Sequence, residues 1–248
     1  MLGLKQLRRW RKKNLSWFHP EYEANGLAVK NRKLDFLDEP RFVAAWEAAV
    51  AGNREGWPRK MPDIRWRAHM ACWAGRHALT LEGDFVECGV HTGLLSMTVC
   101  HYLDFATLAR RFWLFDTFAG IPVDTLPAAE RDKAEAFNES HYFDVWEIAE
   151  RNFAPYPNAQ LVRGVLPGSL AEAELARIAY LSVDLNSASA EKAVMEALWE
   201  RLAPGAPVLI DDYAFKGHDD QYETWNAFAS SRGRMIATLP TGQGLLLR

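Results

Sequence analysis

Short apolar runs alternate with helical segments from residue 84 to the end of the chain. The runs DFVECG, RFWLFD, AQLVRG, AYLSVD and PVLIDD occupy residues 84–89, 111–116, 159–164, 179–184 and 207–212. Strands that alternate with helices form a mostly parallel sheet with helices on its faces. The tail MIATLP–TGQG–LLLR predicts two strands joined by a Gly-rich turn, which makes the last strand antiparallel. The expected fold class is therefore α/β, with a Rossmann-like sheet.

Two further segments complete the predicted organisation. Residues 1–62 are expected to form an amino-terminal helical extension, with one helix at about 40–52, and residues 63–248 the main domain. The stretch 119–158, between the second and third strands, is too long for a simple crossover connection. We interpret it as a lid or substrate-facing insertion. A separate subdomain and an oligomer contact are the alternatives.

Cysteine usage and hydropathy indicate a cytoplasmic protein. The three cysteines, Cys72, Cys88 and Cys100, lie in or beside apolar runs and form no CxxC motif. This pattern favours reduced, buried thiols over a disulfide framework or a zinc site. No apolar run reaches the length of a membrane span, and no secretory signal follows the basic start.

Positive charge is concentrated at the amino terminus. Residues 1–20 carry six Lys or Arg and no acid, interleaved with Leu, Trp and Phe, while residues 21–248 carry a net charge of −9. One interpretation is an interfacial helix on an anionic membrane or acidic glycolipid. The other is a leader that packs on the domain or on a second subunit of a homo-oligomer. The acidic remainder argues against nucleic-acid binding.

Three carboxylates follow two of the predicted strands. Asp184 ends one run and the pair Asp211–Asp212 ends the next, 27 residues later. The carboxyl ends of neighbouring parallel strands meet at the sheet edge where α/β proteins bind ligands. Three converging carboxylates need a cation, and oxygen ligands favour Mg²⁺ or Ca²⁺. The alternative is that Asp211 or Asp212 merely caps the following segment.

The first strand runs into a glycine-containing turn. Its pattern is E-x-G-x-x-x-G, with Glu87, Gly89 and Gly93, and a helix follows. This is not the dinucleotide motif G-x-G-x-x-G, and an acid there suits a ligand that carries an ammonium group. The second strand ends in Asp116, which is placed to accept both hydroxyls of a ribose. Ribose plus ammonium without a phosphate site indicates S-adenosylmethionine, whereas Asp116 could instead be an ordinary turn residue.

The joint spacing of these motifs resembles that of the macrocin- and mycinamicin-type sugar O-methyltransferases. The segments GDFVECGVHTG, FDTFAGIP, LVRG and the D…DD pair carry the resemblance, which covers about residues 63–248. It implies a class I methyltransferase fold and a Mg²⁺ site at Asp184, Asp211 and Asp212. The cofactor-binding residues expected on the matching motifs are Glu87, Gly89, Thr92, Gly93, Ser96, Asp116, Thr117, Phe118, Gly164 and Asp184.

The chain departs from this family at one catalytic position. The second Asp of the family's D-x-D, its general base, is Asn186 here, and an amide cannot take a proton in this role. We predict that His218, six residues after Asp212, replaces it, because imidazole is a suitable base near neutral pH. Asn186 would orient the acceptor or a metal-bound water. The alternatives are that His218 is a surface histidine and that metal coordination alone acidifies the hydroxyl.

The resemblance to sugar enzymes implies methyl transfer from S-adenosylmethionine to a hydroxyl of a sugar or glycoside. A divalent cation bound by two vicinal oxygens would help to ionise such a hydroxyl. A catechol or another phenol is the second acceptor class. Since Asn186 replaces a carboxylate, a module that binds S-adenosylmethionine without catalysis is also considered.

Overall fold

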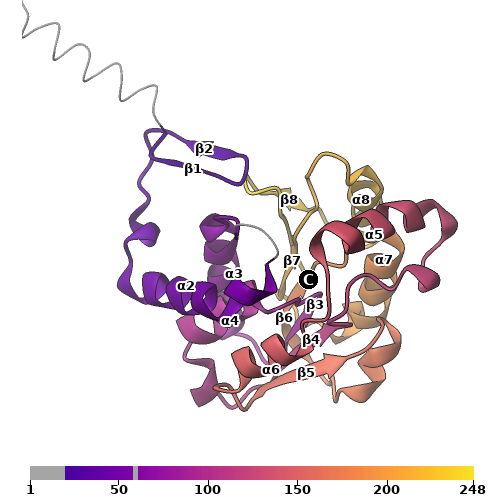
Figure 1. Cartoon of the computed structure of the whole chain (residues 1–248), viewed down its shortest axis with the longest axis horizontal. Helices are drawn as coiled ribbons and strands as arrows, with labels where there is room; N and C mark the ends of the chain where they lie inside the picture. The colour runs from indigo at the N-terminus through magenta and orange to yellow at the C-terminus, as the bar shows by residue number, and fades with distance from the viewer. Residues whose placement is uncertain (1–19, 58–60) are drawn as a thin grey trace, which may run out of the picture.

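A seven-stranded sheet forms the centre of the molecule (Figure 1). The computed structural model describes residues 20–57 and 61–248. The strand order is β5-β4-β3-β6-β7-β9-β8. The basic amino-terminal segment lies almost wholly outside the described residues, so its predicted membrane or subunit contacts stay predictions.

The predicted strands form in the predicted order. They are β3 (Asp84–Cys88), β4 (Phe112–Asp116), β5 (Ala159–Arg163), β6 (Ile178–Val183), β7 (Pro207–Ile210), β8 (Ala237–Thr238) and β9 (Gly244–Leu247). The first five pair in parallel, whereas β9 pairs antiparallel with both β7 and β8. The α/β fold with an antiparallel final strand is therefore confirmed.

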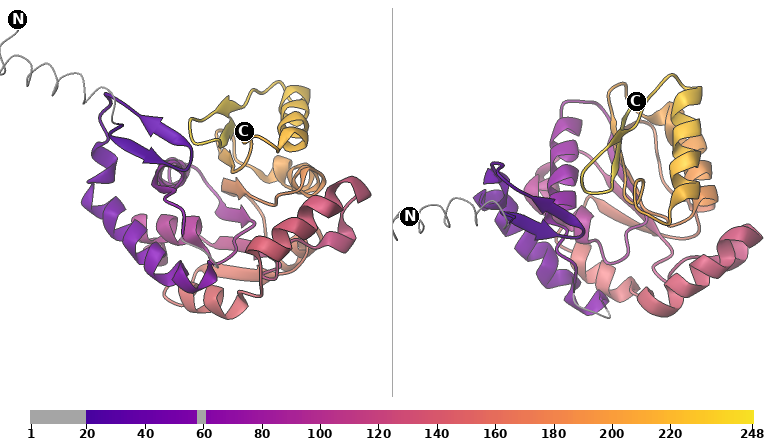
Figure 2. Two further views of the ribbon diagram at one scale, coloured as in Figure 1. Left: turned by 45° about the horizontal axis from the view of Figure 1, so that its top comes forward. Right: turned by 90° about the horizontal axis from the view of Figure 1, so that it is seen from above.

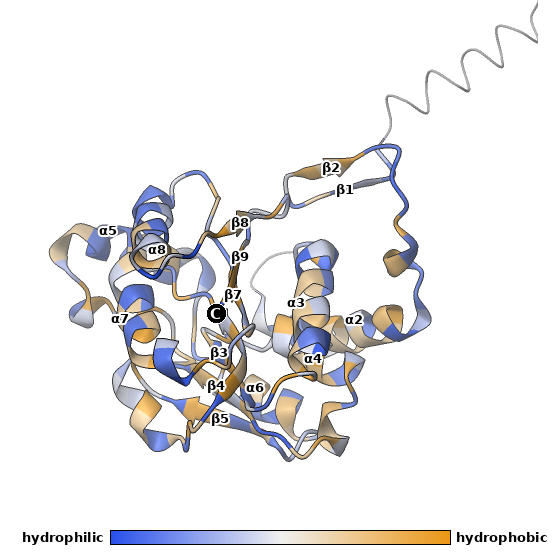
Figure 3. Ribbon diagram, turned by 180° about the vertical axis from the view of Figure 1, so that it is seen from behind, coloured by the Kyte–Doolittle hydropathy of each residue, from blue (hydrophilic) through white to orange (hydrophobic). Residues whose placement is uncertain are grey.

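Helices cover both faces of this sheet (Figure 2). On one face lie α2 (Pro40–Asn53), α3 (Arg65–Ala78), α4 (Leu94–Tyr102) and α6 (Trp146–Phe153), and on the other α7 (Ala188–Leu198) and α8 (Asp219–Ser231). Figure 3 shows the central strands as the most hydrophobic part and the helices as mixed. Strands buried on both faces read as continuous apolar runs, which is why they stand out in the sequence.

Small residues make the buried face of α3. Ala71, Ala74 and Ala78 are almost fully buried, whereas Trp73 keeps 46% of its surface exposed. Added bulk has no room here, because a Cβ on Gly75 would lie 3.1 Å from the Leu103 and Val99 side chains of the α4 region. One charged residue, Arg67, shares this buried face.

The described part of the amino-terminal extension is not wholly helical. It contains the hairpin of β1 (Tyr22–Ala24) and β2 (Leu27–Val29), which the sequence did not predict, followed by α2. Phe42 and Ala49 of α2 belong to the same apolar core as α3 and α4. Because α2 shares this core with the main domain, no separate core marks a boundary at residue 62 in the described residues. The division at residue 62 stays a prediction.

The 119–158 segment folds into two helices with a break between them. These are α5 (Ala128–His141) and α6, after a short 3-10 turn at Val123–Thr125. A backbone hydrogen bond ties the segment back to the sheet edge, because Val145 N–H donates to the Phe118 carbonyl over 2.8 Å. The interpretation of this segment as a lid stays a prediction.

The three cysteines are buried free thiols, as predicted. Burial raises the pKa of the Cys72 and Cys88 thiols above their ordinary value, so both are poor nucleophiles. Within residues 20–57 and 61–248, the helices are too short or too polar to cross a membrane.

Candidate active site

A cavity of about 310 Å³ opens at the carboxyl ends of β3, β4, β6 and β7. The chain leaves β3 for β4 on one side of the sheet and later returns to β6 on the other, which makes this a topological switch point. The predicted site residues that line the cavity are Glu87, Gly89, Asp116, Thr117, Phe118, Gly164, Asp184, Asn186, Asp211 and Asp212. Five separate strands, β3 to β7, therefore bring these residues to one place.

The turn between β3 and α4 requires its two glycines. Gly89 has φ +90°, and a Cβ built on it would lie 1.8 Å from the Asp184 carbonyl oxygen. Gly93 also has φ +90°, and its Cβ would meet the Phe153 ring at 2.4 Å. The loop therefore passes against β6 on one side and α6 on the other with no room for a side chain.

Asp116 clasps this turn with both carboxylate oxygens. Its Oδ2 accepts from the backbone amides of Val90 (2.6 Å) and His91 (2.8 Å). Its Oδ1 accepts from the amide of Phe118 (2.7 Å). Asp116 thus holds the loop as well as facing the cavity, so the turn role and the ligand role considered for it are compatible.

Glu87 is a buried acid with one unsatisfied oxygen. It is 4% exposed, and its Oε2 has no hydrogen-bond partner among the described residues. The pKa of Glu87 is raised to about 8, mainly by burial, with smaller contributions from the charges of Asp211 and Asp116. A buried carboxyl without a partner, facing a cavity, is a candidate to bind a cationic ligand group.

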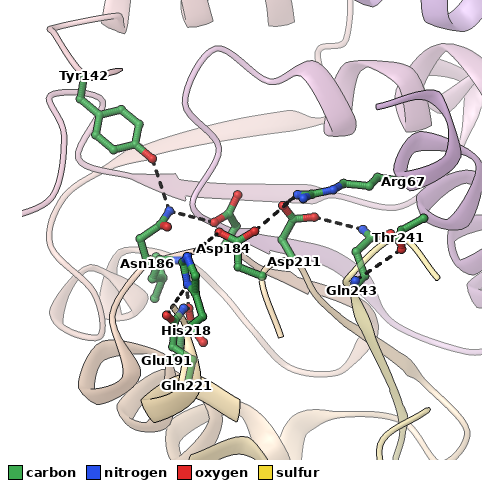
Figure 4. Close-up of polar contacts among 12 residues, drawn as sticks. Arg67, Tyr142, Asp184, Asn186, Glu191, Asp211, His218, Gln221, Thr241 and Gln243 are labelled. Carbon is green, nitrogen blue, oxygen red and sulfur yellow. Dashed lines mark hydrogen bonds and ion pairs between the residues drawn. The ribbon is translucent and has the colours of Figure 1, made fainter. Parts of the chain in front are cut away.

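Asp184, Asp211 and Asp212 converge as the sequence predicts, but an arginine lies among them (Figure 4). Arg67 Nη1 pairs closely with Asp211 Oδ2 and lies 3.6 Å from Asp212 Oδ1. Burial opposes the charge of Arg67, but the three aspartates outweigh it and raise its pKa above the ordinary value. Burial also raises the pKa of Asp184, and the charges of Asp211 and Asp212 add to this effect.

The acidic cluster does not fit a metal ion in this arrangement. Carboxylate oxygens suit Mg²⁺ chemically, but its ligands must converge at about 2.0–2.1 Å. Arg67 contacts two of the three carboxylates, and Gln243 Nε2 donates to the other oxygen of Asp211 over 3.1 Å. In the described part of the chain, no three His, Cys, Asp or Glu side chains are grouped to hold a metal. The Mg²⁺ expectation stays a prediction that this geometry does not support.

Asn186 links the acidic cluster to the 119–158 segment. Its Nδ2 donates to Asp184 Oδ1 (3.1 Å) and to the hydroxyl of Tyr142 (3.3 Å), as Figure 4 shows. The Tyr142 ring also packs against His91 of the glycine turn, with centroids 5.6 Å apart. Asn186 adopts φ +55°, a left-handed conformation that asparagine tolerates better than most residues.

His218 lies behind Asp212 and outside the cavity lining. Its Nε2 is 3.9 Å from Asp212 Oδ2, which is beyond hydrogen-bond distance. Its Nδ1 is 2.6 Å from Gln221 Oε1, while Gln221 Nε2 donates to Glu191 (2.9 Å). Since the amide oxygen can only accept, Nδ1 donates to it, and Nε2 faces Asp212.

Three other predicted cofactor residues lie behind the cavity wall. Thr92 is fully buried, and its carbonyl accepts from Asn152 Nδ2 over 2.8 Å. Ser96 is buried inside α4, and Gly93 caps the start of that helix. These residues shape the turn and do not line the space in front of it.

Sequence reasoning missed five polar residues around the site. They are Arg67, Tyr142, Glu191, Gln221 and Gln243. A signal existed for one of them, because Arg67 shares the spacing of Ala71, Ala74 and Ala78 and so interrupts a buried stripe with a charge. The other four carry no comparable pattern.

A family model matches this architecture and its motifs. The model described as macrocin-O-methyltransferase (TylF) matches residues 64–235 of the chain. The chain belongs to the macrocin-O-methyltransferase family. The resemblance inferred from the motifs is therefore confirmed.

One curated relative of this macrocin-O-methyltransferase family member has moderate sequence identity to it over about half of the chain. A Streptomyces olivaceus protein named 8-demethyl-8-(2,3-dimethoxy-alpha-L-rhamnosyl)-tetracenomycin-C 4'-O-methyltransferase is 30% identical over 141 residues, 54% of each chain. The chain thus matches about half the length of that relative.

Solved structures share the fold. The O-methyltransferase NovP superposes with a TM-score of 0.64 at 20% identity, over 73% of this chain and 79% of NovP. CalS11, a calicheamicin methyltransferase, gives 0.55 at 20% identity, over 89% of this chain and 98% of CalS11. At these identities the likeness establishes the Rossmann-like methyltransferase fold.

Proposed function

We propose that this chain transfers a methyl group from S-adenosylmethionine to a hydroxyl of a sugar or glycoside. The observation that carries the proposal is the shared cavity of Glu87, Asp116 and the acidic cluster at the switch point of the sheet, in a member of the macrocin-O-methyltransferase family. One half of this cavity suits a cofactor and the other half an acceptor.

The cofactor half has the donors and acceptors that S-adenosylmethionine needs. Glu87 Oε2 is buried without a described partner and would bind the ammonium group. Asp116, at the end of β4, would accept from the ribose, and Gly164, after β5, would leave room for the adenine. When bound, S-adenosylmethionine supplies an electrophilic methyl group.

The acceptor half lies between the acidic cluster and the 119–158 segment. Tyr142 and Asn186 sit where a polyhydroxyl ligand could exchange hydrogen bonds, and Phe137 and Leu126 add apolar wall. The name of the Streptomyces olivaceus relative specifies a rhamnosyl group, which favours a deoxysugar-bearing acceptor. A catechol or another phenol is the second acceptor class. Residues 119–158 would act as the lid over this acceptor.

His218 would receive the proton that the acceptor hydroxyl loses. Its Nε2 faces Asp212, which lines the cavity, so the proton would pass through Asp212 or a water. The O–CH₃ bond would form as the S–CH₃ bond breaks and S-adenosylhomocysteine leaves, and the proton of the O–H bond would end on Nε2. Asn186 would hold the acceptor and Asp184 in place. This proton transfer would not involve Mg²⁺, because Arg67 contacts two of the three carboxylates.

Turnover with a panel of acceptors tests the proposal. Purified protein and S-adenosylmethionine are incubated with rhamnosylated polyketides, free sugars and catechols, and S-adenosylhomocysteine is quantified with the methylated product by mass spectrometry. We expect product with a glycoside. Methylation of catechols alone would replace the acceptor class, and binding of S-adenosylhomocysteine without any turnover would favour a non-catalytic binding module.

We also propose how the chain assembles and where it is located. A homo-oligomer, a cytoplasmic location and a membrane contact through residues 1–20 are all consistent with the composition. Light scattering of the full chain, with and without anionic vesicles, tests the first and the third.

A further inference from the structure

Arg67 is a permanent cation placed inside an anionic cluster. It reaches the carboxyl ends of the strands from α3, is buried, and lines the cavity beside Asp184, Asp211 and Asp212. Its guanidinium carbon lies 4.5 Å from the centre of the Phe215 ring, which covers one face of the group. Packing and ion pairing thus fix the guanidinium in this position.

The guanidinium is in the place that a metal ion would need. Arg67 Nη1 pairs with Asp211 Oδ2 and lies 3.6 Å from Asp212 Oδ1, so it bridges the two carboxylates that follow β7. A divalent ion between the same oxygens would meet a positive charge that cannot be neutralised by loss of a proton.

The remaining carboxylate oxygens are partly used by amide donors. Gln243 Nε2 donates to Asp211 Oδ1 over 3.1 Å, and Asn186 Nδ2 donates to Asp184 Oδ1 over 3.1 Å. In Figure 4 these contacts form two runs, one from Tyr142 through Asn186 to Asp184, and one from Arg67 through Asp211 and Gln243 to Thr241. Two amides and one cation therefore occupy an oxygen of each of the three carboxylates.

We propose that Arg67 is the built-in cation of this acidic cluster, standing in place of a divalent metal ion. The folded chain then binds no divalent ion tightly at Asp184, Asp211 and Asp212. Removal of the Arg67 charge should convert the cluster into a metal site. This metal-binding claim does not depend on the proposed function, whereas metal-independent turnover rests on it.

Binding of Mn²⁺ tests the proposal without any activity assay. Mn²⁺ is added to the wild type, to Arg67→Met and to the control Arg65→Met, and the free Mn²⁺ in each sample is measured by electron paramagnetic resonance. Arg65 is on the same helix but pairs with Asp63, away from the cluster. We expect Arg67→Met to bind one Mn²⁺ per chain, at least about 100-fold tighter than the wild type and Arg65→Met. The additional change Asp211→Asn should remove this site.

Two results would overturn the proposal. One tightly bound Mn²⁺ per wild-type chain, lost in Asp211→Asn, would show that Arg67 does not fill the cation position. A folded Arg67→Met protein that binds Mn²⁺ no more tightly than the wild type would also contradict the proposal. If Arg67→Met unfolds because its carboxylates are left unpaired, recovery of the circular dichroism spectrum by Mn²⁺, but not by the same ionic strength of Na⁺, is the expected result.

Activity gives a separate reading. If the proposed function is correct, EDTA leaves wild-type turnover unchanged. Loss of turnover in EDTA, restored by Mg²⁺, contradicts the built-in cation but leaves the methyltransferase proposal intact. Absence of turnover under every condition contradicts the function and leaves the Mn²⁺ result to decide on Arg67.

Discussion

The buried carboxyl of Glu87 has a consequence for stability that can be measured without any ligand. Its pKa is about 8 in the folded protein because it is buried, against an ordinary value of 4.5. Between these pH values the folded chain binds a proton that the unfolded chain has lost. Stability should therefore fall as pH rises through this interval, by up to about 5 kcal/mol for this group.

The variant Glu87→Gln should lose this part of the pH dependence. Urea unfolding at pH 5 and pH 9, without cofactor, measures it, and the exposed Glu147→Gln serves as the control. The slope should become smaller but not vanish, because burial also raises the pKa of Asp184 and Asp211. An unchanged slope in Glu87→Gln would mean that Glu87 is ionised in the folded state.

His218 is the second residue whose role can be isolated. Gln221 fixes its proton on Nδ1, so Nε2 is free to act as a base toward Asp212. We expect His218→Ala to lower kcat by about 10²- to 10⁴-fold, the usual contribution of a positioned base, with little change in cofactor affinity. Asn186→Asp should then restore part of kcat, because it returns a carboxylate next to Asp184. A wild-type kcat in His218→Ala would leave His218 as an ordinary loop residue.

Among the elements, the 119–158 segment lies beside the proposed acceptor half of the cavity, which it lines with Phe137, His141 and Tyr142. Tyr142, directly after α5, contacts both Asn186 and His91. These contacts join the segment to the loop after β6 and to the turn after β3. Ala149 and Phe153 of α6 belong to the core, whereas α5 buries Ala134 alone, so α5 is the part of this segment that can move without disturbing the core.

This arrangement predicts a selective effect of Tyr142→Ala. The acceptor KM should rise by about tenfold, since loss of one hydrogen bond and an aromatic contact costs about 1–2 kcal/mol. The dissociation constant of S-adenosylhomocysteine should change little. Steady-state kinetics and calorimetry measure the two quantities, and Phe143→Ala, at an exposed neighbour, is the control. Equal losses of acceptor and cofactor affinity would argue against a lid that acts on the acceptor.

At the scale of the whole molecule, the site is held by the sheet itself. The cavity draws residues from the ends of β3, β4, β6 and β7 and from α3, so it exists only when the complete sheet is folded. A ligand that binds this cavity therefore binds the folded chain and not the unfolded one. Binding must then raise the free energy of unfolding.

S-adenosylhomocysteine should stabilise the protein by about 2.7 kcal/mol at a concentration 100 times its dissociation constant. For a chain of this size each kcal/mol shifts the melting temperature by about 2–4 °C, so the melting temperature should rise by about 5–11 °C. Asp116→Ala should lose most of this rise, because Asp116 both clasps the turn and faces the cavity. Melting temperatures that do not respond to S-adenosylhomocysteine in the wild type would contradict the cofactor assignment.

The sequence by itself determined the sheet and the carboxylates that lie at the carboxyl ends of its strands. Apolar runs of strand length ended in Glu87, Asp116, Asp184 and Asp211, and parallel pairing necessarily brings such ends together. The E-x-G-x-x-x-G turn was readable for the same local reason, because Gly89 and Gly93 adopt a conformation that other residues avoid.

Only the tertiary structure decided which groups meet these carboxylates. Arg67, Tyr142 and Gln243 come from α3, the 119–158 segment and the end of the chain, and their contacts depend on how those elements dock. His218 was recognisable as an imidazole near the site, but its place behind Asp212 follows from its bond to Gln221. Local patterns specify backbone conformation and burial, whereas the pairing of distant polar side chains is fixed only by packing.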